Sequence, residues 1–152
     1  MGDLTIGASQ AGAITLSGSV GADAAAGAAV MLIGNGDTST LTLSGADYNS
    51  GSSAQTYTAD AFVINGTDPT FTSSNAAIKF VDGASSDIIL SDTANLTIRT
   101  SGGLIDIEPE IIGTADGANT TVTMNAGSGN IVLDNTGAVS YTHLTLPTIA
   151  LV

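Results

Sequence analysis

Three carboxylates around one proline are the residues best spaced for catalysis. Asp106, Glu108 and Glu110 occupy alternate positions about Pro109, so on an extended segment their side chains would face one way. Two carboxylates flanking a groove can hydrolyse a glycosidic bond. Asp106, however, lies between two isoleucines, where an outward polar residue is expected, and aromatic platforms for sugar stacking are scarce. We therefore interpret the carboxylates as a solvated face and predict no enzyme and no catalytic residues.

His143 is the single imidazole of the chain. A histidine base needs a nucleophile to activate and an acid to orient it. Because His143 lies in a C-terminal stretch that we exclude below, we predict no catalytic role for it.

Two glycine- and aspartate-rich segments raise the question of calcium. Residues 34–38 (Gly-Asn-Gly-Asp-Thr) and 45–47 (Gly-Ala-Asp) are weakly similar to calcium-binding nonapeptide turns. Those turns bind through tandem copies with oxygen ligands from neighbouring coils. Here the copies are neither tandem nor in register, so we predict ordinary turns, no cofactor and no metal site, with calcium as the weaker alternative.

Threonine pairs and two isolated bases complete the polar candidates. If stacked on one flat face, the pairs could order water and bind ice, but their spacing is unequal and favours ordinary polar strand faces. The pairs are Thr38/Thr40, Thr40/Thr42, Thr56/Thr58, Thr70/Thr72 and Thr121/Thr123. Lys79 and Arg99 are interpreted as surface charges or local partners for aspartates.

Composition limits the classes of function that these residues can have. The 152 residues suggest one domain and carry 14 acidic against two basic side chains, a net charge of −12. Such a charge argues against nucleic acid or anionic lipid as partners, and no apolar window is long enough to span a membrane. The absence of cysteine excludes disulfides and thiolate chemistry. With only 4% aromatic residues, we expect a narrow core of Ile, Leu, Val and Ala.

The elements that must position these side chains are short strands. Apolar residues alternate with a polar residue, often threonine, in repeated triplets, which is typical of a strand with one buried face. We predict that the apolar triplet members are buried and their threonine neighbours exposed. The predicted buried residues are Leu41, Leu43, Leu96, Ile98, Ile105, Ile107, Ile131 and Leu133.

Strand spacing favours a solenoid. From Val63 to Val139 the successive apolar starts are mostly seven to ten residues apart, with one step of 18, and Gly/Asn/Asp/Ser clusters separate them. A near-constant step is expected for the short faces of a solenoid, whereas a sandwich usually brings more aromatics. We predict an all-β, parallel β-helix (β-solenoid) with about ten or more strands. Asn65-Gly66 alone could form a hairpin turn, and Val20–Val30 a helical turn or, more in keeping with Gly21 and Gly27, a loop.

Several segments resemble strand repeats of giant bacterial surface proteins, namely autotransporter passengers and filamentous-haemagglutinin-like adhesins. The segments are 41–51, 56–65, 94–104 and 122–131, and the resemblance covers about residues 1–138. It implies a right-handed parallel β-helix that is secreted and displayed as a stalk or adhesin, without catalytic residues. The repeat pattern has no recognisable caps and Met1–Ile6 lacks signal-peptide features. We therefore expect a solenoid segment of a larger protein, open at both ends, with the signal peptide elsewhere.

The last stretch has a different character. Residues 139–148 (Val-Ser-Tyr-Thr-His-Leu-Thr-Leu-Pro-Thr) resemble the translation of a transposase adaptor used in sequencing libraries. The stretch also lacks the regular turn residues. We therefore divide the chain into a solenoid segment, 1–138, and a non-native, adaptor-derived tail, 139–152, of a metagenomic fragment; the alternative is a genuine terminal strand.

Deleting residues 139–152 should change the free energy of unfolding by no more than about 1 kcal/mol. Side chains that were never selected to pack with the coils contribute little, whereas a selected strand would contribute roughly 1.5–3 kcal/mol for each large aliphatic that it buries. Denaturation midpoints of residues 1–138 and 1–152 make the comparison, and a loss of several kcal/mol would show that the tail belongs to the fold.

These observations together predict a structural or adhesive repeat module of a secreted bacterial cell-surface protein. Its expected partners are neighbouring repeats of the parent chain and a surface ligand, without nucleic acid or membrane insertion. The alternative is a carbohydrate-binding or carbohydrate-active β-helix, which would need a groove holding carboxylates and an aromatic platform.

Overall fold

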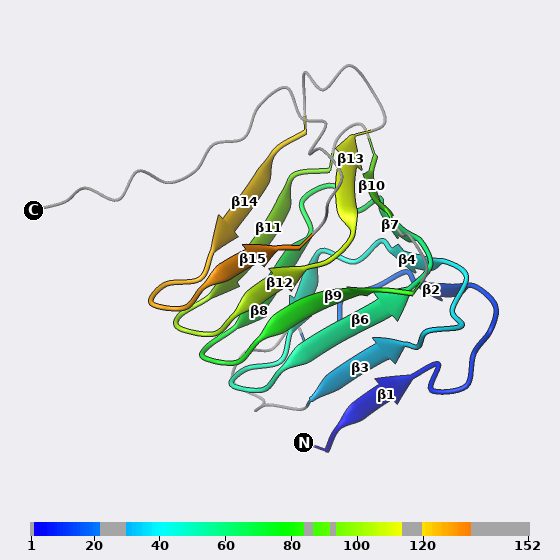
Figure 1. Cartoon of the computed structure of the whole chain (residues 1–152), viewed down its shortest axis with the longest axis horizontal. Coiled ribbons are helices and arrows are strands. Elements are labelled where there is room, and N and C mark those ends of the chain that lie inside the picture. The colour runs from blue at the N-terminus through cyan, green and yellow to red at the C-terminus, as the bar shows by residue number, and fades with distance from the viewer. Residues whose placement is uncertain (1, 22–29, 84–86, 92–93, 114–119, 135–152) are drawn as a thin grey trace, which may run out of the picture.

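The chain folds as a stack of short parallel strands. The structure is a computed structural model that describes residues 2–21, 30–83, 87–91, 94–113 and 120–134. Within these ranges it contains fifteen strands and no helix (Figure 1). All pairs between the described strands are parallel, and each joins strands of successive coils. The predicted all-β parallel solenoid is therefore confirmed.

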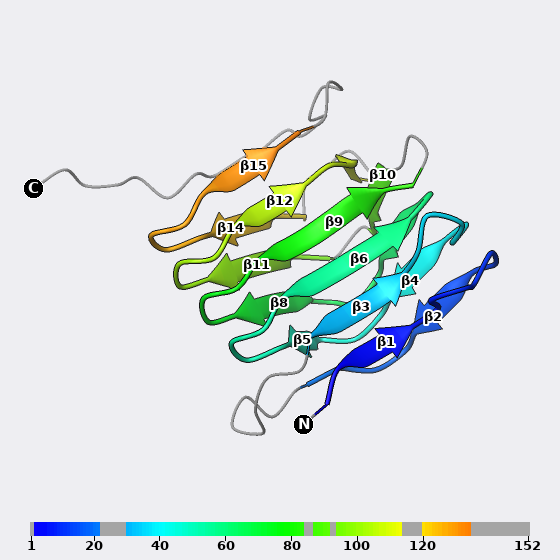
Figure 2. The same cartoon turned by 60° about the horizontal axis from the view of Figure 1, so that its bottom comes forward.

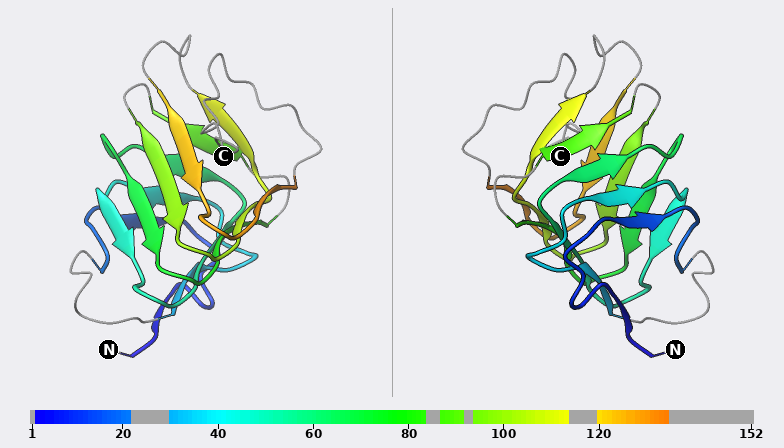
Figure 3. Two further views of the ribbon diagram at one scale, coloured as in Figure 1. Left: turned by 90° about the vertical axis from the view of Figure 1, so that its left-hand side faces the viewer. Right: turned by 90° about the vertical axis from the view of Figure 1, so that its right-hand side faces the viewer.

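The strands form three sheets, here called A, B and C. Sheet A contains β1 (Leu4–Ile6), β3 (Met31–Gly34), β6 (Gln55–Ala59), β9 (Ile78–Asp82), β12 (Ile105–Ile107) and β15 (Ile131–Leu133), in that order (Figure 2). Sheet B contains β2 (Ile14–Leu16), β4 (Leu41–Leu43), β7 (Phe62–Ile64), β10 (Asp87–Leu90) and β13 (Glu110–Gly113). Sheet C contains β5 (Asp47–Asn49), β8 (Thr70–Ser73), β11 (Leu96–Thr100) and β14 (Val122–Asn125). Figure 3 shows the stack from two opposite sides.

The register defines each coil of the stack. One column of inward residues in sheet A runs through Leu4, Met31, Gln55, Ile78, Ile105 and Ile131. Each step along this column is one coil. The step from Ile78 to Ile105, for example, passes through β10 of sheet B and β11 of sheet C. Three faces of the predicted seven to ten residues account for such a coil, which explains why the strand starts recur so regularly in the sequence.

Alternation places the triplets largely as predicted. Six of the eight named residues are at most 1% exposed: Leu41, Leu43, Leu96, Ile98, Ile105 and Ile107. The prediction is wrong for Ile131 and Leu133 of β15, which are 40% and 45% exposed. Within the described residues β15 pairs with β12 alone, so no further coil covers its inward side chains.

The threonines of the triplets also divide into two groups. Thr5, Thr15 and Thr123 are exposed, as predicted, whereas Thr42 and Thr97 are half-buried. The two half-buried threonines lie on strands with a paired neighbour on both sides, so outward side chains in the same column shield them.

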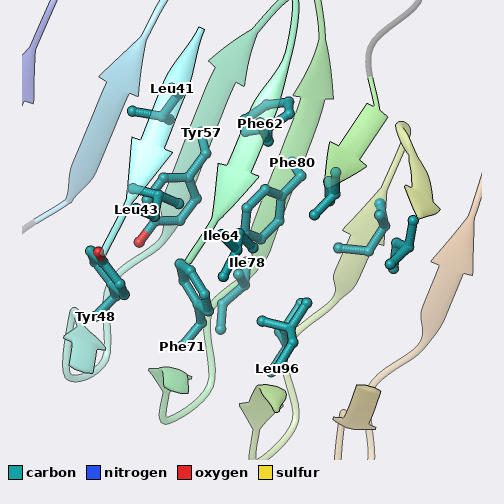
Figure 4. Close-up of a cluster of buried hydrophobic side chains, with 14 of the residues drawn as sticks. Leu41, Leu43, Tyr48, Tyr57, Phe62, Ile64, Phe71, Ile78, Phe80 and Leu96 are labelled. Carbon is teal, nitrogen blue, oxygen red and sulfur yellow. The ribbon is translucent and has the colours of Figure 1, made fainter. Parts of the chain in front are cut away.

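Aromatic residues, although few, are concentrated in the centre of the core (Figure 4). Tyr48, Tyr57, Phe62, Phe71 and Phe80 are completely buried. Tyr48 stacks on its register partner Phe71 with ring centroids 4.7 Å apart, and Tyr57 stacks on Phe80 at 4.9 Å. Edge-to-face contacts of 5.3 and 5.2 Å link Phe71 to Tyr57 and Phe80. The expected core of aliphatic and small residues is therefore incomplete, because parallel register brings the scarce rings together.

One buried polar side chain joins this cluster to a corner. The Gln55 amide donates to the carbonyl oxygens of Tyr48 (3.1 Å) and Thr72 (2.7 Å) and to the Ser50 hydroxyl (3.1 Å). Its Oε1 accepts from the Tyr57 hydroxyl at 2.7 Å. Burial raises the pKa of Tyr57 well above its ordinary 10.0, so the hydroxyl keeps its proton and remains a donor. A buried amide with both ends bonded avoids the cost of an unsatisfied polar group.

Two local predictions have different outcomes. The hairpin at Asn65-Gly66 is wrong: β7 and β8, which flank it, belong to different sheets, so the segment is a corner between sheets B and C. The helical or loop segment Val20–Val30 falls mostly outside the described residues, although Val20 itself forms a parallel bridge with Tyr48.

The proposed tail, 139–152, and His143 also lie outside the described residues. The described residues include no apolar helix of the length that a membrane span requires.

Candidate functional site: a polar hollow on sheet C

The outward face of sheet C carries two ranks of polar side chains. The first, the threonine rank, consists of Asp47, Thr70, Thr97 and Thr123. The second, the arginine rank, consists of Asn49, Thr72, Arg99 and Asn125. Strand register builds both ranks, because residues in the same position of successive coils lie side by side. Their apolar neighbours, such as Phe71 and Ile98, point into the core.

A hollow of about 440 Å³ opens at the carboxyl ends of β8, β11 and β14. Polar residues and one glycine line it: Thr72, Ser73, Ser74, Arg99, Thr100, Ser101, Asn125 and Gly127. Gly127 has φ +59°, and a Cβ there would lie 2.3 Å from the Ser101 carbonyl oxygen. Glycine therefore allows the chain to turn tightly beside the hollow without a side chain blocking it. None of the lining residues is acidic, in a chain of net charge −12.

Some polar groups of the hollow are already used by the fold. The Thr100 hydroxyl donates to the carbonyl oxygens of Gly103 (2.8 Å) and Ala126 (3.3 Å), and the Ser73 hydroxyl donates to Ser53 O (3.2 Å). Asn125 Oδ1 accepts from the Gly127 backbone N–H at 2.9 Å. These bonds hold the rim of the hollow in one conformation.

Other groups remain available to a ligand. In the described part of the chain, the side chains of Thr72, Ser74, Arg99 and Ser101 and the Asn125 Nδ2 make no hydrogen bond. Arg99, Ser74, Ser101 and Asn125 are exposed and Thr72 is half-buried. The hollow thus presents a guanidinium fork, three hydroxyls and one amide donor around a common space.

The two bases of the chain differ in their surroundings. Lys79 Nζ lies 2.8 Å from Asp106 Oδ2, and the two residues are register partners on sheet A. Arg99, on sheet C, has no carboxylate partner among the described residues. The interpretation as a partner for an aspartate therefore holds for Lys79, and the interpretation as a surface charge holds for Arg99, which is exposed.

The three carboxylates singled out from the sequence are divided between two sheets and the corner that joins them. Asp106 lies on β12 of sheet A and Glu110 on β13 of sheet B. Between them Glu108 Oε2 accepts from the Asp82 N–H at 3.0 Å. The chain turns a corner at Pro109, so the shared direction expected of an extended segment is lost. Asp106 and Glu110 are therefore placed on different faces of the solenoid.

The glycine-aspartate segments are bonded as turns. Asn35 Oδ1 accepts from the Asp37 N–H at 2.7 Å, and the Asn35 amide donates to Gly7 O and, at 3.2 Å, to Gln10 O. In the second segment, the Gly45 N–H donates to the Tyr48 hydroxyl at 2.9 Å and Asp47 belongs to the threonine rank. Within the described ranges, no three His, Cys, Asp or Glu side chains gather as a metal site would require.

The threonine pairs lie on different sheets. Thr56/Thr58 belong to sheet A and Thr70/Thr72 to sheet C, while Thr38 is buried and donates to Gln10 O at 3.0 Å. Only single threonines align, as in the run Thr70, Thr97 and Thr123. A regular double rank for binding ice is therefore not formed by the described residues.

Comparison of the chain with protein-family models, with curated proteins and with solved structures found no match. The fold and the hollow therefore carry the functional argument. The hollow was not predicted from the sequence, because its residues come from three coils and only the strand register brings them together. One signal in the sequence could have indicated the hollow. The outward residues Thr72 and Arg99 are each followed by two hydroxyl residues, Ser73-Ser74 and Thr100-Ser101, which occupy the same place in successive coils.

Proposed function

We propose that this chain is a structural and adhesive module of a secreted bacterial cell-surface protein and has no catalytic role. The observation that carries the proposal is the continuous parallel stacking of three sheets about one buried core. Successive coils stack in the same three sheets, so such a module extends a rod while presenting ranks of side chains on its faces. The resemblance of the repeats to autotransporter passengers and filamentous-haemagglutinin-like adhesins supports the same role.

A carbohydrate-binding module is the second candidate, and the hollow on sheet C favours it over a carbohydrate-active one. Hydroxyls, an amide and a guanidinium suit sugar hydroxyls and acidic groups. Asp106 and Glu110 lie on different sheets, which disfavours a hydrolytic carboxylate pair. Binding by this face would make adhesion and carbohydrate recognition one function.

Display of the chain on a bacterial surface tests the proposal. Cells that display it through a neutral anchor are expected to retain it against added protease and to adhere to a host-cell monolayer more than cells that display a scrambled chain of the same composition. Purified chain should release no reducing ends from polysaccharides. Rapid proteolysis would overturn the structural role, adhesion equal to the scrambled control would overturn the adhesive role, and released reducing ends would show an enzyme.

A further inference from the structure

We infer that the hollow around Arg99 binds an acidic saccharide, with the anionic group on the guanidinium and the sugar hydroxyls on Thr72, Ser74, Ser101 and Asn125. The inference rests on the adhesive part of the proposed function and names its ligand class. The structural part of that function does not depend on it.

The charge of the ligand follows from Arg99. Its fork of N–H donors matches a carboxylate or a sulfate, and charge-assisted pairs of this kind are among the stronger hydrogen bonds. Arg99 is exposed on β11, which lies between β8 and β14 in sheet C. No acidic residue lines the hollow to neutralise it. A guanidinium that has no carboxylate partner among the described residues is therefore placed to receive an anion from outside.

The saccharide part follows from the remaining lining. A hollow of about 440 Å³ is within the size range of small-molecule sites, commonly about 300–1,000 Å³. Its available groups are hydroxyls and an amide, and no aromatic or large aliphatic side chain lines it. An apolar ligand would leave these groups unpaired, whereas a sugar can bond to several at once.

The affinity should be modest. The five aromatic side chains in the described residues are all buried in the core, so none offers a stacking surface. Polar contacts alone must compensate for displaced water, which places the dissociation constant for one sugar unit in the millimolar range. Repetition along a long surface protein would raise the overall avidity without a new contact.

An NMR titration of the full chain tests the inference. Sodium glucuronate is expected to shift amide signals of Thr72, Arg99, Ser101 and Gly127, while glucose binds at least about tenfold more weakly because it lacks the charge. The affinities for glucuronate and glucose 6-sulfate, compared with each other, show whether the site prefers a carboxylated or a sulfated saccharide, and both are acidic saccharides. Acetate carries a carboxylate without a sugar, so its affinity shows whether the sugar contributes to binding.

Two variants that remove one positive charge each supply the matched control. Arg99→Gln should weaken glucuronate binding at least about tenfold, the loss expected for a charge-assisted bond. Lys79→Gln, on sheet A, should leave the binding within about twofold, because it changes the net charge equally but lies outside the hollow. Denaturation midpoints verify that both variants are folded.

Several results would overturn the inference. If glucose bound as tightly as glucuronate, the charge would have no role in binding. If acetate bound as tightly as glucuronate, the sugar would have no role. Equal losses in Arg99→Gln and Lys79→Gln would place the site elsewhere. A chain that resists protease on the cell surface but does not bind glucuronate or glucose 6-sulfate overturns this inference and leaves the structural module standing.

Discussion

Replacing Phe71 by alanine is expected to lower the free energy of unfolding by about 3–5 kcal/mol, the usual cost of removing a large aromatic side chain from a core. Phe71 is completely buried and contacts three other rings, with Tyr48 stacked 4.7 Å away. The surrounding strands are fixed by hydrogen bonds to the coils on either side, so they can close the cavity only partly. Chemical denaturation followed by far-ultraviolet circular dichroism gives the value.

Thr70→Ala is the matched control for this prediction. Thr70 is the preceding residue on β8, but its side chain faces outward in the threonine rank. Its loss should cost less than about 1 kcal/mol, the span of strand propensities. Phe71→Leu, which keeps more of the volume, should be intermediate and remains measurable if the alanine variant does not fold. Equal costs for Phe71→Ala and Thr70→Ala would contradict the position assigned to the ring.

The strands and their parallel stacking could be predicted because they depend on local patterns. Leu41-Thr42-Leu43 and Ile105-Asp106-Ile107 alternate with a period of two, and their repetition at short, regular steps excludes long helices and favours coils. Burial of the apolar members follows directly once each strand has neighbours on both sides. The prediction of burial was wrong for Ile131 and Leu133, because alternation indicates on which face of the strand a side chain lies, and not whether a further coil covers that face.

The candidate site could not be predicted in the same way. Asp106 and Glu110 share parity in the sequence, but the corner at Pro109 sends them to different sheets. Thr72, Arg99 and Asn125 are far apart in the sequence, yet parallel register makes them neighbours. Successive coils differ in length, so a one-residue error in the length of a coil changes every side-chain neighbour across it. The chemistry of this surface therefore depends on register, which composition and local pattern do not determine.

The strand register also brings the backbones of successive coils close together at certain corner glycines. Gly45→Ala should therefore lower the free energy of unfolding by about 1–3 kcal/mol, the usual cost of overpacking a tight site. A Cβ on Gly45 would lie 2.4 Å from the Gly18 carbonyl oxygen, which belongs to the same corner of the preceding coil. The obstacle is backbone, so it cannot rotate away as a flexible side chain would. Relief would require the two coils to separate and would disturb the Gly45 N–H bond to Tyr48.

Gly18→Ala makes the same chemical change on the other side of this contact and serves as the control. No atom lies within 4 Å of the position where its Cβ would be, and its φ is not in the left-handed region. Reduced freedom of the unfolded chain should therefore leave the stability unchanged or raise it by up to about 1 kcal/mol. Denaturation midpoints of the two variants give the difference. If Gly45→Ala were as stable as Gly18→Ala, the coils that carry β2 and β4 would not stack in the register that pairs Ile14 with Leu41.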